Sequence, residues 1–93
     1  MKSYASVDRI EGTFAVCEVE MLDVKESKTI DYSQKETEMI DISLKKVYEH
    51  VTDIQEGDIL VVEHNGAEVS EVYCKDDEEK QRRIAIIQKI MDK

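Results

Sequence analysis

The sequence contains no proline and no tryptophan, and it has only three glycines among its 93 residues. With 41% hydrophobic residues, this is the composition of a folded domain and not of a disordered linker. No stretch approaches the roughly 20 apolar residues that a membrane-spanning helix needs, and the N-terminal segment has no apolar core of a signal peptide. We therefore expect a single domain, residues 1–93, that is cytoplasmic and has no membrane partner.

Cysteine is also scarce, since the chain has only Cys17 and Cys74, far apart in the sequence. Small secreted domains usually carry more cysteines, as disulfides. A zinc site would have to combine both cysteines with His50 and His64, but no two of these four residues have the close spacing of a zinc motif. The alternative is two packed thiols in apolar strands and two imidazoles at the surface. We expect the second arrangement, with no metal and no cofactor.

Basic residues are also few, because the chain has 13 of them against 22 acidic residues and its net charge is −9. The acidic excess lies in residues 36–75, where ten acidic residues accompany three basic ones. Nucleic-acid affinity depends on Lys and Arg that neutralise phosphates, so we expect no nucleic-acid partner. Small barrels do often bind RNA or DNA, and a nucleic-acid-linked regulator remains an alternative. Its only local source of positive charge is Lys80, Arg82 and Arg83.

Alternating apolar residues predict strands over most of the chain. Residues 4–10 and 13–22 predict a hairpin with its turn at Glu11-Gly12, and residues 37–43 predict a third strand. The run Ile-Leu-Val-Val at 59–62 is typical of a strand buried on both faces. An Asn-Gly turn then leads to a last strand at 67–74. The pattern favours an α+β, mostly β fold, a small SH3-like or OB-like antiparallel barrel of about five strands within residues 4–75.

Three segments fall outside this strand pattern. Residues 23–36 are polar and irregular, which predicts a flexible arm or loop, and residues 44–51 predict a short amphipathic helix. Residues 76–93 predict a C-terminal helix capped by Asp76 or Asp77. Its large apolar residues form two adjoining stripes, Ile84, Ile87 and Met91 beside Ile86 and Ile90. We expect this helix to pack across one open end of the sheet. The alternative is partial exposure, which would give a homodimer through the helix or a docking edge for another protein.

Three stretches, VDRIEGTFAVCE, EGDILVVE and EEKQRRIAIIQKI, together resemble a bacterial family known as domain of unknown function 3006. The matching positions belong to that family's N-terminal hairpin, its Glu-Gly-Asp turn and its Arg-rich terminal helix: Asp8, Arg9, Glu11, Gly12, Phe14, Ala15, Val16, Glu18, Glu56, Gly57, Asp58, Arg82, Arg83 and Ile84. The chain departs from the family in its longer segment 22–36 and in lacking a Leu-Pro near the short helix. The resemblance implies a small, mostly β domain with no established catalytic residues. Some relatives look to be attached to, or encoded near, metallo-β-lactamase-fold hydrolases, which implies an accessory role.

We therefore expect a non-catalytic protein-binding accessory or regulatory module of unknown partner, and not an enzyme. Tyr32, in the polar arm, is a candidate anchor, because tyrosine is enriched at interface hot spots. The pair Asp8 and Arg9 is a second candidate, although a cross-strand ion pair, or Asp8 accepting backbone N–H groups, would also explain it. The helix residues Lys80, Arg82 and Arg83 are the third. A metal-binding or hydrolytic protein that uses the two cysteines and two histidines is the remaining alternative.

Overall fold

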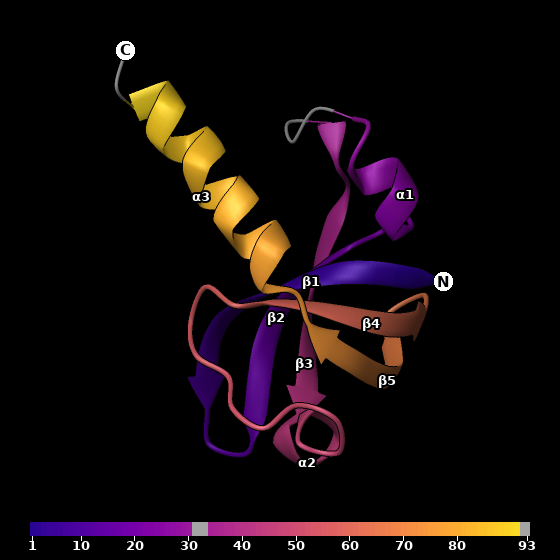
Figure 1. Ribbon diagram of the computed structural model, residues 1–93. Helices are drawn as coiled ribbons and strands as arrows, with labels where there is room; N and C mark the ends of the chain where they lie inside the picture. Colours follow the sequence, from indigo (N-terminus) through magenta and orange to yellow (C-terminus); the bar gives the residue numbers. More distant parts are fainter. Residues whose placement is uncertain (31–33, 92–93) are drawn as a thin grey trace.

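The computed structural model describes residues 1–30 and 34–91 of the chain. Five strands form one antiparallel sheet in the order β3-β2-β1-β4-β5, curled into a half-barrel (Figure 1). Their bounds are Lys2–Glu11 for β1, Phe14–Glu20 for β2, Thr37–Ser43 for β3, Ile59–Asn65 for β4 and Glu68–Lys75 for β5. Three helices complete the fold: α1 (Val24–Ser27), α2 (Leu44–Val47) and α3 (Asp77–Met91). The predicted mostly β, α+β class is confirmed.

The two predicted hairpin turns lie where the glycines allow them. Gly12 and Gly66 have φ values of +57° and +62°, a region that other residues adopt only with strain. The β1–β2 register then runs from Glu11 opposite Phe14 to Ala5 opposite Val19, with a bulge between Val7 and Arg9. These tight turns join β1 to β2 and β4 to β5. Strands β2 and β3 pair across the longer segment between them, and the β1–β4 pairing joins segments about 60 residues apart, such as Lys2 and Glu63.

The main core fills the concave face of the sheet. Alternate residues of the strands supply it, because successive side chains of a strand point to opposite faces; among them are Ala5, Cys17, Ile42 and Leu60. Helix α2 and the loop after it close this face with three buried side chains, Val47, Val51 and Ile54. The helix predicted over 44–51 is therefore shorter than expected. Val51, the last apolar residue of the predicted helix, reaches the core from non-helical backbone, because the chain must turn there toward β4.

A smaller cluster covers the outer face of the sheet. It consists of Tyr4, Ile59 and Val61, with Val24 of α1 and Tyr73 of β5 packed against them. Strand β4 is thus buried on both faces, as its uninterrupted apolar run predicts.

Helix α1 corrects the prediction that residues 23–36 contain no regular structure. Asp23 caps this helix, because its Oδ1 accepts hydrogen bonds from the backbone N–H groups of Lys25 and Glu26, each at 2.9 Å. The cap satisfies donors that the short helix would otherwise leave open.

Helix α3 projects away from the sheet, as Figure 1 shows. It begins as predicted, with Asp76 Oδ1 accepting the N–H of Glu79 at 2.9 Å. The expectation that it packs across an open end of the sheet is wrong. The five large apolar residues of its second half, Ile84, Ile86, Ile87, Ile90 and Met91, are between 37% and 78% exposed. The ion pairs that join α3 to the body of the protein come from Lys80 and Arg83, in its first turns. Among the described residues, no helix combines the length and apolar character needed to cross a membrane.

Candidate interaction site

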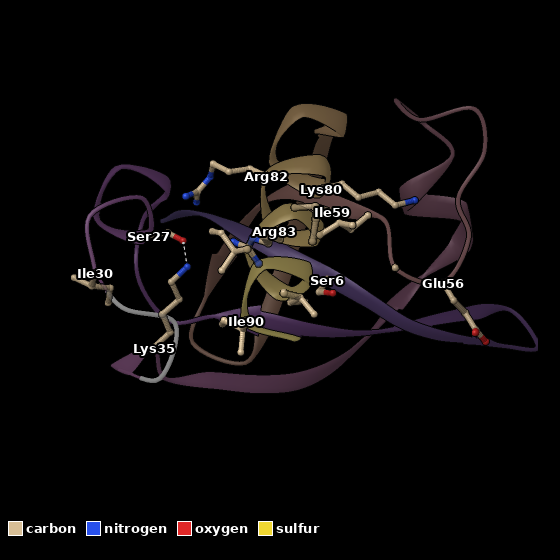
Figure 2. Close-up of a pocket in the computed structure, with 14 residues that line it drawn as sticks. Ser6, Ser27, Ile30, Lys35, Glu56, Ile59, Lys80, Arg82, Arg83 and Ile90 are labelled. Atoms are coloured by element: carbon tan, nitrogen blue, oxygen red, sulfur yellow. Dashed lines mark hydrogen bonds between the residues drawn. The ribbon is translucent and has the colours of Figure 1, made fainter. Parts of the chain in front are cut away.

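A groove of about 610 Å³ lies beside helix α3 and is called the α3 groove here. The helix forms one wall, the segment that follows β2 forms the other, and the outer face of the sheet lies between them. Figure 2 shows Ile90 and Arg83 on the helix, Ser27, Ile30 and Lys35 on the opposite wall, and Ser6 and Ile59 from the sheet. Four isoleucines of α3 line the groove: Ile84, Ile86, Ile87 and Ile90.

One face of α3 changes its chemistry halfway along the helix. Residues three or four apart share a helix face, so Glu79 and Arg83 lie in line with Ile86, Ile87 and Ile90. In the first turns this face is ionic and turned toward the body of the protein, where the Glu79 side chain is only 3% exposed. In the last turns it is apolar and overhangs the groove. The overhang is residues 84–91, and the described structure places nothing over it.

Two buried carboxylates hold the base of the helix, Glu20 on β2 and Glu79 on α3, each 3% exposed. Arg83 joins them, because its Nε donates to Glu79 Oε2 at 2.7 Å and its Nη2 lies 2.9 Å from Glu20 Oε2. The second contact lacks hydrogen-bond geometry, so it is an ion pair only. Arg82 adds two hydrogen bonds of 2.8 Å to the carboxylate of Glu79.

The segment after β2 completes this ionic cluster from the other side. Ser27 Oγ donates to Glu20 Oε1 at 2.5 Å, and Lys35 Nζ donates to Ser27 Oγ at 2.9 Å. Lys35 Nζ also lies 3.7 Å from Glu20 Oε2. The cluster therefore connects α3, β2 and α1, and it fixes the angle at which the helix leaves the sheet.

Burial and pairing act in opposite directions on the titrating groups of this cluster. Burial disfavours the charged form of Glu79, but the N–H donors of Arg82 and Arg83 outweigh it and hold the pKa of that carboxyl below its ordinary value. Burial lowers the pKa of Lys35, and the negative charge of Glu20 opposes this only in part. The ionised form of Glu79 is thus the stable one at neutral pH.

Two further contacts fix the first turns of α3. The guanidinium of Arg83 lies over the ring of Tyr4, 5.1 Å from its centroid, a cation–π arrangement. Lys80 Nζ donates to Asp58 Oδ1 at 2.7 Å, and Asp58 is 1% exposed. The other carboxylate oxygen of Asp58 accepts the backbone N–H of Gln55 at 2.9 Å. Asp58 therefore ties the loop before β4 to the helix.

The structure brings together the three predicted basic residues, Lys80, Arg82 and Arg83, at the base of α3. Each is paired with an acidic side chain of the same chain: Lys80 with Asp58, Arg82 with Glu79, and Arg83 with both Glu20 and Glu79. Their positive charge is thus paired within the chain, and their role in binding a partner stays a prediction.

The predicted pair Asp8 and Arg9 lies on β1, outside the lining of the α3 groove. Arg9 bonds along its own strand, to Asp8 Oδ2 and to Glu11 Oε1, both at 2.7 Å. The hypothesis of a cross-strand ion pair is therefore wrong, because the bulge after Val7 places these side chains next to one another. Both are about half exposed. Tyr32 lies outside the described residues.

The four residues of the hypothetical zinc site lie apart in different environments. Cys17 is buried in the main core, where desolvation raises the pKa of its thiol to about 12. Cys74 is exposed near the end of edge strand β5, so the prediction that it is packed is wrong. His50 is at the surface, 3.3 Å from Glu71. In the part of the chain that the structure describes, no group of three or more His, Cys, Asp or Glu side chains is placed to hold a metal ion.

His64 also corrects the sequence prediction, because it is only 4% exposed and not at the surface. It continues the inward alternation of Leu60 and Val62 along β4. Its Nε2 lies 2.8 Å from Ser3 Oγ, whose own proton goes to the carbonyl of Leu22 at 2.7 Å. Its Nδ1 lies 3.2 Å from the carbonyl oxygen of Gly66. His64 links β4 to β1 and to the end of the β2 segment.

Sequence reasoning missed the residues that shape the site. Glu20 stands in the same polar alternation as Glu18, and nothing local marks it as buried. Asp58 stands out in the sequence only as part of the Glu-Gly-Asp turn. Ser27 and Lys35 belong to a segment predicted to be irregular. The isoleucine stripes were found, because their spacing is local.

Comparison of the chain with family models, with curated proteins and with solved structures finds no match. The resemblance to domain of unknown function 3006 therefore stays a prediction.

Proposed function

We propose that this chain is a non-catalytic, protein-binding accessory or regulatory module, and that its contact surface is the α3 groove together with the overhang of α3. One observation carries the proposal: five large apolar side chains, 37–78% exposed, lie on one half of a helix beside an apolar groove. Contiguous exposed apolar patches of this kind mark protein interaction sites. An amphipathic helix beside a groove is a recurring form of them.

The rigidity of the helix base supports the same proposal. Arg83 and Lys80 fix the first turns of α3 to the body through ion pairs with the buried carboxylates of Glu20 and Asp58. The helix therefore presents its isoleucines at a set angle before any partner arrives. Preorganisation of this kind reduces the entropy that binding would otherwise cost.

The chemistry of the groove also favours binding over catalysis. Six of its described lining residues are isoleucines, and its basic residues Lys80, Arg82 and Arg83 are paired with carboxylates of the same chain at the base of the helix. A general acid or base would need a titrating group directed toward a substrate, whereas Glu20 and Glu79 are directed toward Arg83. We propose that these groups position the helix and do no chemistry.

A pull-down from nuclease-treated lysate of the source cell tests the proposal. The bait is the full chain, compared with the double variant Ile87→Glu/Ile90→Glu and with Phe14→Glu as a control. Phe14 is also exposed, at 46%, but lies on β2 outside the groove lining. We expect a stoichiometric protein with the wild type and the control, and its loss with the double variant. Circular dichroism verifies that all three proteins are folded. A protein retained equally by the double variant would contradict the proposal. So would the absence of any retained protein, untagged copies of this chain included.

A further inference from the structure

We propose that the α3 groove is filled by helix α3 of a second copy of this chain, in an antiparallel dimer with two-fold symmetry. This inference rests on the proposed function, because it names the occupant of the same surface.

The geometry of the groove favours a copy over an unrelated partner. The isoleucines of the overhang line one wall of the groove, and they are also exposed to solvent. A second copy therefore brings a matching insert and a matching groove. Each helix can lie in the groove of the other, so the contact is the same from both sides. Such an isologous contact closes on itself and gives a dimer.

The charges favour a copy that approaches in the antiparallel sense. Two chains of net charge −9 repel one another over most of their surfaces. In residues 84–91, however, the only charged residue is Lys89. The first turn of α3 carries exposed acidic residues, Asp77 and Glu78. An antiparallel arrangement moves Lys89 toward the acidic first turn of the other helix and opposes the two helix dipoles favourably. A parallel arrangement would place like ends together.

The size of the overhang sets the strength of the contact. Its eight residues span about 12 Å of helix at 1.5 Å per residue, and the groove wall adds Ile30 and Ile59. A contact this short belongs to the class of small, weak interfaces, which bury less than about 1,200 Å² in total. We therefore expect a reversible dimer with a dissociation constant of about 10⁻⁵ to 10⁻⁴ M.

Sedimentation equilibrium of the full chain between about 5 and 500 μM tests the inference over the expected range of dissociation constants. The matched variants are Ile87→Glu, within the overhanging face, and Ala85→Glu, on the opposite side of the same turn. Both add one negative charge to an exposed position of α3. We expect the wild type and Ala85→Glu to follow a monomer–dimer equilibrium of a 10.8 kDa chain. We expect Ile87→Glu to bind its copy at least about tenfold more weakly, a factor that corresponds to 1.4 kcal/mol.

A cross-link locates the contact independently. In a Cys74→Ser background, Ile84→Cys places a thiol in the groove lining near the two-fold axis, because an antiparallel pairing of Lys89 with residues 77–78 brings residues 83–84 of the two helices opposite one another. Mild oxidation should then give a disulfide-linked dimer. Ala85→Cys in the same background should cross-link at least about tenfold more slowly. Equal rates for the two cysteines would contradict the predicted face.

The outcomes separate this inference from the proposed function. In one outcome, the chain stays monomeric at all concentrations, but the pull-down still yields a partner that Ile87→Glu/Ile90→Glu loses. That result overturns the second copy as the occupant of the groove and leaves the proposed function standing. A dimer that Ile87→Glu does not weaken overturns the inference as well, because the copies would then meet elsewhere. A dimer lost in Ile87→Glu and kept in Ala85→Glu supports it.

Discussion

At the scale of single residues, three buried carboxylates determine how the site is built: Glu20, Asp58 and Glu79. Burying a charge is unfavourable unless a cation and hydrogen bonds compensate for it. Each of the three has that compensation, from Arg83, Lys80 or Arg82. Their removal should therefore destabilise the protein through the partner left behind, and not only through the lost contact.

The first prediction concerns Glu79. Replacing it with glutamine removes the negative charge that faces Arg82 and Arg83, and Arg83 is left buried beside Glu20 alone. Breaking a buried ion pair costs about 3–5 kcal/mol, and because Arg82 is 45% exposed we expect the lower figure of about 2–3 kcal/mol. Urea unfolding followed by circular dichroism measures it. Glu78→Gln, at the adjacent exposed position, is the control and should change stability by less than about 0.5 kcal/mol. Equal losses in the two variants would refute a special role for Glu79.

The second prediction concerns the pH dependence that Asp58 confers. Burial would raise the pKa of its carboxyl, but the hydrogen bonds from Lys80 and from the backbone of Gln55 outweigh burial and lower it. A lowered folded-state pKa contributes stability that is complete above the unfolded-state value, about 4. That contribution is lost as the pH falls through the folded-state value.

We therefore expect the free energy of unfolding to decrease as the pH falls from about 5 toward 3. The decrease should be smaller in Asp58→Asn, whose side chain does not ionise. Urea titrations at a series of pH values measure both slopes. Glu79 titrates in the same direction, so the variant should keep part of the slope. Parallel curves for the two proteins would show that Asp58 does not contribute.

The third prediction distinguishes the two thiols. Cys17 is buried with a thiol pKa of about 12, because of desolvation first and then the charges of Asp41 and Asp8, whereas Cys74 is exposed. The thiolate is the reactive form. With a thiol reagent at pH 8, Cys74 should react at once and Cys17 only when the protein opens, at least about 10³-fold more slowly. A Cys74→Ser variant should lack the fast phase. A fast phase of two thiols in the wild type would disprove the burial of Cys17.

At the scale of the elements, α3 is a helix of two halves. Its first turns are held by Glu79, Lys80 and Arg83, and its last turns carry exposed isoleucines. Helix stability in proteins comes mostly from packing of a face. The second half, without a cover, therefore depends on the first half for its order and adds little to the stability of the domain.

The fourth prediction follows from that division. Ile90→Ala should change the free energy of unfolding of the chain by no more than about 0.5 kcal/mol at low protein concentration, because Ile90 is 68% exposed. Leu60→Ala, at a fully buried position of β4, should cost about 2–5 kcal/mol through the lost burial and the cavity. Chemical denaturation at a few micromolar compares the two proteins. A large loss in Ile90→Ala at that concentration would mean that the second half of α3 is covered within a single chain.

At the scale of the whole molecule, the net charge of −9 and the internal pairing of the basic residues act together. The cluster of Lys80, Arg82 and Arg83 could have formed a basic stripe. Instead, each of these residues faces an acidic side chain of the same molecule. A phosphate backbone would meet a surface that repels it over most of its extent.

The fifth prediction is that the chain does not retain nucleic acid. Filter binding with single- and double-stranded DNA and with RNA, at about 50 mM salt where electrostatic binding is strong, should give no retention above background. An unrelated basic protein serves as the positive control. Retention that weakens steeply with added salt would restore the nucleic-acid-linked alternative.

Local rules were enough for most of the fold. The alternation of apolar residues located four strands, and an uninterrupted apolar run located the fifth, β4. Gly12 and Gly66 located two turns, and the pair Asp76 and Asp77 located the start of the last helix. Each of these signals depends on residues within a few positions of one another, which is why the sequence contains it. Even the isoleucine face of α3 was evident, because helical periodicity spans only three or four residues.

Whether a given side chain or helix face is buried depends on what packs against it, and only the tertiary structure decided this. Glu18 and Glu20 occupy equivalent places in the alternation of β2, yet only Glu20 lies beneath Arg83 and is fully buried. Likewise, the sequence determined that α3 has an apolar face, but the angle at which the helix leaves the sheet determined that this face is exposed. That angle depends on contacts between residues that are distant in the sequence, such as Glu20 with Arg83 and Asp58 with Lys80. No local pattern encodes the distance between such residues, because it is set only when the strands have assembled.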